Sequence, residues 1–174
     1  LKPRGAGDDT RITPKLGLIW HPGIDTTLRA AFLRVVKRKI NDDAGLEPTQ
    51  VSGIDQYYDD GNGSKSSGGA LAADFKPYDT MRAGASLSRR NVDVPLINGD
   101  ESIEFHRYRE REAGAYVHWT LGKVATLGVR VRHTRYARTE DSVGDEGFSI
   151  VDTTQLPVSL NGFGPRGLWS PLVV

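Results

Sequence analysis

The chain has 174 residues, with 23 Lys and Arg against 22 Asp and Glu, four His and no Cys. This length suits one domain, or a piece of a larger one. It is long enough to form a hydrophobic core that does not depend on disulfide bonds. The lack of Cys excludes disulfide bonds and thiolate metal sites. The formal net charge of +1 gives no overall attraction to nucleic acid or anionic membranes. The chain has no run of about 18 apolar residues, so the sequence predicts no transmembrane helix.

Apolar and polar residues alternate along six stretches of the chain. For example, Val129 and Val131 alternate with Arg130 and Arg132. A period of two residues predicts β-strands, because successive side chains of a strand point to opposite faces. The six stretches are 15–21, 70–76, 81–88, 114–121, 126–134 and 155–160.

Residues 26–40 fit two patterns. Leu28, Ala31 and Phe32 follow the spacing of an amphipathic helix. The segment also follows directly on the predicted strand 15–21 and the turn at 21–25. In this position it fits the second strand of a hairpin. Both interpretations stay open at this point. We expect a strand, because a strand keeps the alternation of short and long connections unbroken.

The connections between the predicted strands alternate in length. Four short turns rich in Gly, Pro and Asp separate three long polar loops. We therefore expect a single all-β domain over 1–174, an antiparallel up-and-down meander of about eight strands. The short turns lie near 21–25, 76–80, 121–124 and 161–167, and the long loops near 39–67, 91–104 and 138–152.

Such sorting of short turns to one end is typical of an outer-membrane β-barrel, whose strands alternate apolar-out and polar-in. Six aromatic residues at or near the short turns would form one interfacial girdle. A soluble sandwich shows the same alternation of faces, so alternation alone does not separate the two classes. We expect an outer-membrane β-barrel, or a segment of a larger one. The six aromatic residues are Trp20, Phe75, Tyr78, Trp119, Phe163 and Trp169.

Three stretches, 14–20 (PKLGLIW), 26–31 (TTLRAA) and 46–51 (LEPTQV), resemble the barrel of TonB-dependent-receptor-like outer-membrane proteins. The similarity is to the barrel found after tetratricopeptide repeats in some Gram-negative proteins. The later Phe75, Ser88-Arg89-Arg90 and Val94-Pro95 fit the same pattern. The resemblance implies a barrel in the outer membrane, and transport or secretion only loosely. With no repeat or plug domain, no start resembling a signal peptide and no terminal aromatic residue, we expect a partial chain.

Polar residues of the strands would face the interior of such a barrel. There they would fill a small barrel or line an open lumen, and an excess of Arg would favour anions. The residues expected to face the interior are Arg29, Asp74, Lys76, Arg82, Tyr116, His118, Arg130 and Arg132.

A second set of basic residues falls near the long-loop ends of the strands. In a barrel these residues would form a belt at the outer rim, suited to the phosphates of lipopolysaccharide. A solvated rim without a ligand is the alternative. The belt would contain Arg34, Lys37, Arg38, Arg89, Arg90, Arg107, Arg109, Arg135 and Arg138.

The sequence contains no strong catalytic or metal-binding motif. The four His lack the spacing of metal ligands, and residues 60–64 begin like a calcium loop without its later Gly and Glu. His118 with Ser86 or Ser88, oriented by Asp74, is formally a catalytic set, but no nucleophile-turn motif supports it. We expect no enzymatic activity, no metal and no cofactor.

The predicted function is that of a channel or receptor-type conduit in a bacterial outer membrane, or of a membrane anchor. Expected partners are outer-membrane lipids, lipopolysaccharide, further barrel strands, and a periplasmic repeat domain or partner protein. The mixed charges of residues 105–112 cancel most of their field, so we expect no nucleic-acid partner. The second hypothesis is a soluble β-barrel or sandwich that binds a ligand. The third is an outer-membrane enzyme that modifies lipids.

Overall fold

The computed structural model describes residues 12–37, 50–55, 63–97, 103–138, 150–164 and 167–173. Every regular element in these ranges is a β-strand. The strands are β1 (Lys15–Gly23), β2 (Thr26–Val36), β3 (Gln50–Val51), β4 (Ile54–Asp55), β5 (Lys65–Tyr78), β6 (Met81–Ile97), β7 (Ile103–Leu121), β8 (Ala125–Arg138), β9 (Ile150–Gln155), β10 (Val158–Gly164) and β11 (Gly167–Val173).

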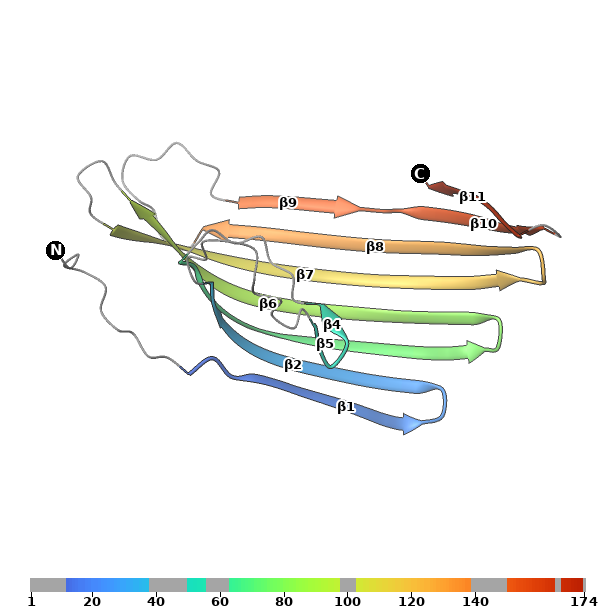
Figure 1. Cartoon of the computed structure of the whole chain (residues 1–174), viewed down its shortest axis with the longest axis horizontal. Helices are drawn as coiled ribbons and strands as arrows, with labels where there is room; N and C mark the ends of the chain where they lie inside the picture. The colour runs from blue at the N-terminus through green and yellow to red at the C-terminus, as the bar shows by residue number, and fades with distance from the viewer. Residues whose placement is uncertain are drawn as a thin grey trace.

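The main sheet is an antiparallel meander with the order β1-β2-β5-β6-β7-β8-β10-β11, and β9 also pairs with β8. If β9 and β10 are counted as one interrupted strand, the sheet has eight strands, as the sequence predicts. The meander is not closed into a barrel: among the described strands, β1 pairs with β2 alone and β11 with β10 alone. Figure 1 shows β1 and the β9–β11 segment at opposite edges of the sheet.

The ambiguous segment 26–40 forms a strand as far as Val36. β2 pairs without a break with β5, from Thr26 opposite Phe75 to Val36 opposite Lys65. Neighbouring strands on both sides therefore decide the conformation, because an isolated amphipathic pattern of this length is a weak determinant. The expectation of a strand is confirmed over the described residues.

The strands are longer than the sequence pattern indicates. β6 continues to Ile97 and β7 starts at Ile103, so paired strands take up most of the expected loop at 91–104. The register runs unbroken from Met81 opposite Trp119 to Ile97 opposite Ile103. Charged residues obscured this continuation, since the strict apolar alternation stops before it. The expected loops at 39–67 and 138–152 are also shorter than predicted. Their end residues belong to β5, which starts at Lys65, to β8, which ends at Arg138, and to β9, which starts at Ile150.

The expected strand at 155–160 is interrupted in its middle. β9 ends at Gln155 and β10 starts at Val158, leaving Leu156 and Pro157 outside both strands. Pro157 has no N–H to donate, so it cannot continue the ladder as a donor. Its carbonyl still accepts a hydrogen bond from the Arg130 amide over 3.0 Å, which keeps both strands beside β8.

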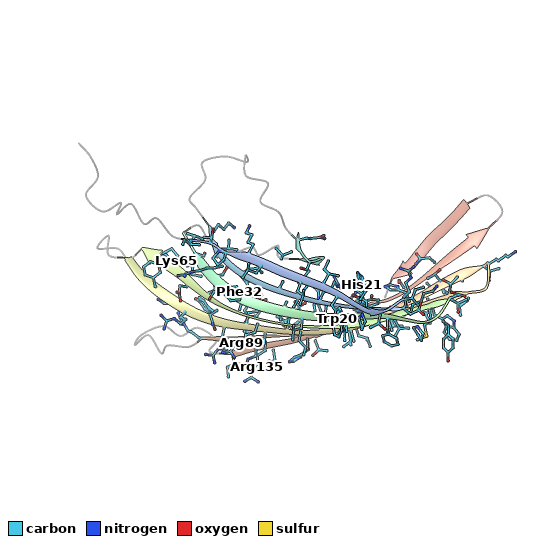
Figure 2. The ribbon with its side chains drawn as sticks, turned by 90° about the horizontal axis from the view of Figure 1, so that it is seen from below. Trp20, His21, Phe32, Lys65, Arg89 and Arg135 are labelled. Atoms are coloured by element: carbon cyan, nitrogen blue, oxygen red, sulfur yellow. The ribbon has the colours of Figure 1, made fainter. Side chains whose placement is uncertain are left out.

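The pairing registers give the sheet two different faces. Opposite residues share a face, and Gly84 lies opposite both Asp74 and Tyr116, so these polar side chains lie together. The other face carries Leu71 and Leu87, with exposed fractions of 61% and 60%. Figure 2 shows a bowed sheet, and Arg89, on the same face as Leu87, points from its convex side. We call the two sides the concave, polar face and the convex, apolar face.

The buried core of the described residues is small. Its apolar members are Ala31, Leu33, Ala72, Ala83 and Val92, none of them aromatic. The large apolar side chains are instead exposed, and most of them lie on the convex face, including Leu16, Leu18, Trp20, Phe32, Leu71, Phe75, Leu87 and Trp119. A soluble domain of this length normally buries such residues. The described part of the chain therefore leaves its main apolar surface uncovered.

A short hairpin, β3–β4, folds back onto the concave face from the connection between β2 and β5. Ser52 and Gly53 form its two-residue turn with φ of 53° and 67°, the left-handed conformation that tight hairpin turns require. Gly17 of β1 makes room for it, because a Cβ at Gly17 would overlap the Ser52 Oγ. The hairpin thus covers part of the polar side of the sheet.

Candidate functional site

Four elements meet in a hydrogen-bonded network on the concave face. Arg29 of β2 places Nη2 2.7 Å from Asp74 Oδ2 of β5, and its Nη1 donates to the Gly53 carbonyl of the hairpin over 2.5 Å. The Tyr116 hydroxyl of β7 donates to Asp74 Oδ1 over 2.6 Å. Asp74 is thereby satisfied on both carboxylate oxygens, and the network links the hairpin to three strands of the sheet.

Gly84 of β6 gives this network its space. It lies between Asp74 and Tyr116 in the register. A Cβ at Gly84 would lie 2.6 Å from the Tyr116 ring and 2.7 Å from Asp74 Oδ1. The missing side chain therefore lets Tyr116 reach across β6 to β5.

Three more of the residues predicted to face the interior surround this network. Arg82 lies opposite His118, and Tyr116 lies opposite Arg130. The rings of Tyr116 and His118 are 5.2 Å apart between centroids, at an interplanar angle of 48°. The concave face therefore brings together most of the predicted interior set.

Ion pairs continue along this face toward the long-loop end. Arg90 pairs with Glu110, and Arg132 Nε lies 3.5 Å from Glu112 Oε1. Arg138 is hydrogen-bonded to the buried His106. Arg90 and Arg138, which the sequence places in the outer belt, thus lie on the concave face. Among the described residues, the arginines of this face still outnumber its acids: Arg29, Arg82, Arg90, Arg130, Arg132 and Arg138 against Asp74, Glu110 and Glu112.

Lys76 is separate from the network, at the short-turn end of β5. Its Nζ lies 2.5 Å from Asp79 Oδ1 in the turn between β5 and β6. The hydrogen bond and the positive charge of Lys76 lower the pKa of the exposed Asp79 carboxyl below its usual value. This pair stabilises the local turn geometry, and it does not reach the interior set.

On the convex face an apolar band ends abruptly at a row of cations. One row, Ala30–Leu71–Leu87–Ala113, is apolar across four strands. The next row toward the long loops contains Arg89, Arg111 and Arg135 side by side on β6, β7 and β8. Figure 2 shows Arg89 and Arg135 toward the long-loop end and Trp20 toward the other.

The structure distributes the rest of the predicted belt as follows. Arg34 and Arg109 lie one row beyond Arg89, and Arg107 one row further. Lys37 directly follows β2, and its amide donates to the Ser64 carbonyl over 2.9 Å. Arg38 lies outside the described residues. Lys65, which is not in the predicted belt, lies in the same row as Arg107.

Trp20, Phe75 and Trp119 lie on the convex face close to the short turns, and each is about half exposed. Tyr78 is 70% exposed at the turn itself. The side chains of Phe163 and Trp169 lie outside the described residues. The four described members thus lie at the end of the apolar band opposite the cations.

The residues considered for catalysis do not form a triad. Asp74 is bonded to Arg29 and Tyr116. Ser86 lies opposite Gly114, four residues along β7 from His118, or about 13 Å. In the described part of the chain, no three His, Asp or Glu side chains group as metal ligands. No helix in these ranges is both long and apolar enough to cross a membrane.

Sequence reasoning missed the hairpin and the acids Glu110 and Glu112. Val51-Ser52-Gly53-Ile54 did carry a signal, a two-residue turn between β-branched residues. Glu110 and Glu112 gave none, because the charged run 105–112 hides which of its residues share a face.

Comparisons with known proteins identify no family for this chain: no family model, no curated protein and no solved structure matches it.

Proposed function

We propose that this chain is a membrane-embedded β-sheet, a segment of an outer-membrane β-barrel, that serves as a channel or receptor-type conduit or as a membrane anchor. The observation that carries the proposal is the convex apolar band. It is uncovered, and it ends in aromatic side chains on one side and in arginines on the other. This order matches a bilayer. The apolar band would face the hydrocarbon core, the aromatic side chains would lie at one interface, and the arginines would contact the headgroups at the other.

The height of the band supports the proposal. On β7, the apolar positions of the convex face extend from Ala113 to Leu121. These nine residues match the about 9–11 residues with which a tilted transmembrane β-strand crosses the hydrocarbon core. The unbroken pairing of the central strands also satisfies their backbone groups, as lipid requires.

The concave face supports the role of a lining or filling surface. It is polar, rich in arginine and partly covered by the β3–β4 hairpin through Arg29 and Gly53. An aqueous path along this face would favour anions. The β3–β4 hairpin would narrow this aqueous path.

Partners follow from the two open edges and from the rim. β1 and β11 each have an unpaired edge among the described strands, and further barrel strands would pair there, since unpaired edges are not tolerated in lipid. Outer-membrane lipids and lipopolysaccharide would contact the convex face. A periplasmic repeat domain or partner protein, as the sequence resemblance implies, would lie on the short-turn side. This model requires no nucleic acid, cofactor or catalytic residue.

The test is folding in detergent followed by electrophoresis in SDS with and without heating. In detergent or lipid, the β1 and β11 edges must pair with each other or with another copy of the chain. We therefore expect a compact band that shifts on heating, and retention of the folded chain by lipid vesicles in a flotation gradient. A folded monomer in plain buffer that does not float with vesicles would contradict the proposal.

A second candidate is a soluble ligand-binding β-module. The observation that favours it is a hollow of about 550 Å³ on the convex face, lined by Leu16, Phe32 and Leu71 among others. In that case an apolar ligand would cover the band. Stability in buffer without detergent, increased by an apolar ligand, distinguishes this candidate from the first.

A further inference from the structure

A cationic cleft opens on the convex face at the long-loop end of the sheet. It measures about 290 Å³, and four of its lining side chains are cations: Arg34, Lys65, Arg107 and Arg109. One carboxylate, Asp93, lines it as well, and it accepts a hydrogen bond from Arg107 Nε over 3.0 Å. Among the described lining residues, four cations against one carboxylate leave an excess of positive charge that suits a phosphate group.

An apolar furrow begins directly below the cleft. Phe32, Gly69 and Arg89, at the end of the furrow, are paired neighbours in one row. The next row, about 7 Å along the strands, holds Arg34 and Ser67 of the cleft. The cleft and the furrow are therefore adjacent parts of one surface.

The furrow continues across the apolar band to the aromatic end. A second hollow of about 380 Å³ shares Leu18, Leu71 and Leu87 with the first and reaches Trp20. Small residues such as Ala30 and Ala73 form its floor. From Leu28, opposite Trp20, to Arg34 is six residues of β2, or about 20 Å. This length accommodates an extended fatty acyl chain.

We infer that cleft and furrow together form a binding site for one anionic lipid, with its phosphate in the cleft and one acyl chain in the furrow. The inference rests on the proposed function, because the lipid reaches the convex face from the bilayer. Charge complementarity determines the headgroup, since a lipid without net charge offers less attraction to Arg34 and Arg109 than an anionic one. The furrow favours a lipid over free phosphate, since phosphate alone leaves the apolar surface uncovered.

Trp20 reports on this site, because it lines the far end of the furrow. The full chain, with Trp119→Phe and Trp169→Phe, is folded into phosphatidylcholine vesicles. Equal small fractions of phosphatidylglycerol or phosphatidylcholine with brominated acyl chains are then added, since bromine quenches nearby tryptophan. We expect the anionic lipid to be enriched about fivefold at Trp20, the effect of roughly one surface cation.

Arg34→Gln and Arg109→Gln should each reduce this enrichment by at least half, because each removes one charge from the cleft. Lys123→Gln is the matched control: it removes one exposed charge in the turn between β7 and β8, away from the cleft, and should leave the enrichment unchanged. Equal quenching by the two brominated lipids, in a chain that floats with the vesicles, overturns the lipid site but not the proposed function. A chain that does not float overturns both.

Discussion

Arg29 and Asp74 form their ion pair diagonally across β2 and β5, since Arg29 lies directly opposite Ala72 and Asp74 directly opposite Thr27. In this diagonal ion pair Arg29 uses Nη2, so its Nη1 is free to donate to the Gly53 carbonyl of the β3–β4 hairpin. Asp74 uses Oδ2, so its Oδ1 accepts the hydrogen bond from the Tyr116 hydroxyl. One arginine and one aspartate thus connect the hairpin to the centre of the sheet.

Arg29→Gln should loosen the hairpin without disrupting the sheet. The change removes the ion pair and the charged hydrogen bond to Gly53, a type of bond that contributes roughly 1.5–3 kcal/mol. Amide hydrogen exchange over residues 50–55 should become about tenfold faster or more, as measured by mass spectrometry. Arg111→Gln, on the convex face, is the control. Unchanged exchange over 50–55 in Arg29→Gln would contradict this role.

Gly17→Val should displace the hairpin from β1. A Cβ at Gly17 overlaps Ser52, whereas a Cβ at Gly23 of the same strand meets nothing within 4 Å. We expect Gly17→Val to make residues 50–55 accessible to limited proteolysis, and Gly23→Val to leave them protected. Equal cleavage in the two variants would refute the close packing of hairpin and strand.

Gly84→Ala should destabilise the folded protein. The added methyl collides with the Tyr116 ring and Asp74 Oδ1, and overpacking of this kind costs about 1–3 kcal/mol. Gly114→Ala is the control on the same face, because its nearest neighbour is the movable Ser86 Oγ at 3.3 Å. Urea unfolding in detergent, followed by tryptophan fluorescence, should separate the two variants. Similar midpoints would argue against the tight Asp74–Tyr116 arrangement.

The turn between β5 and β6 should show a pH signature. The hydrogen bond from Lys76 and its charge lower the pKa of Asp79. A carboxyl whose pKa is lower in the folded state stabilises the turn above its unfolded pKa, and this contribution is lost as the pH falls through the folded pKa. NMR titration should place the Asp79 midpoint below that of an unpaired Asp, and Lys76→Gln should raise it. A midpoint that Lys76→Gln does not move would exclude the pair in solution.

Leu87→Lys should impair membrane insertion, whereas Ser88→Lys should not. Leu87 lies in the convex band, while its neighbour Ser88 lies on the concave face opposite Glu112. A lysine within a lipid-facing band costs up to about 2–4 kcal/mol at the midplane and less near its edge. The folded yield in vesicles measures the difference. Equal yields would contradict a lipid-facing convex side.

The sequence was informative where the period of two was strong. It predicted an all-β meander of about eight strands, the identity of β2 as a strand and the common face of Asp74, Tyr116 and Arg130, because strand alternation fixes which residues face together. These features depend on local pattern and on short connections. The structure adds which strands pair and in which register.

The sequence did not predict features that depend on distant contacts. The hairpin at 50–55 lies in a segment expected to be a loop, and its position depends on Gly17 and Arg29 far along the chain. Arg90 and Arg138 were assigned to the outer belt from their position near strand ends. Their place on the concave face was not predicted, because a shift of one residue changes the face. Closure into a barrel stays a prediction, because β1 and β11 do not pair with each other.

The central claim, that the convex band faces lipid, is tested most directly by single cysteines at positions 85–88. The natural chain has no Cys, so each of these four positions can carry one nitroxide spin label. In vesicles, labels at 85 and 87 should collide mainly with dissolved oxygen, which concentrates in lipid, and labels at 86 and 88 mainly with a water-soluble nickel chelate. Uniform access of the chelate to all four positions would contradict the account.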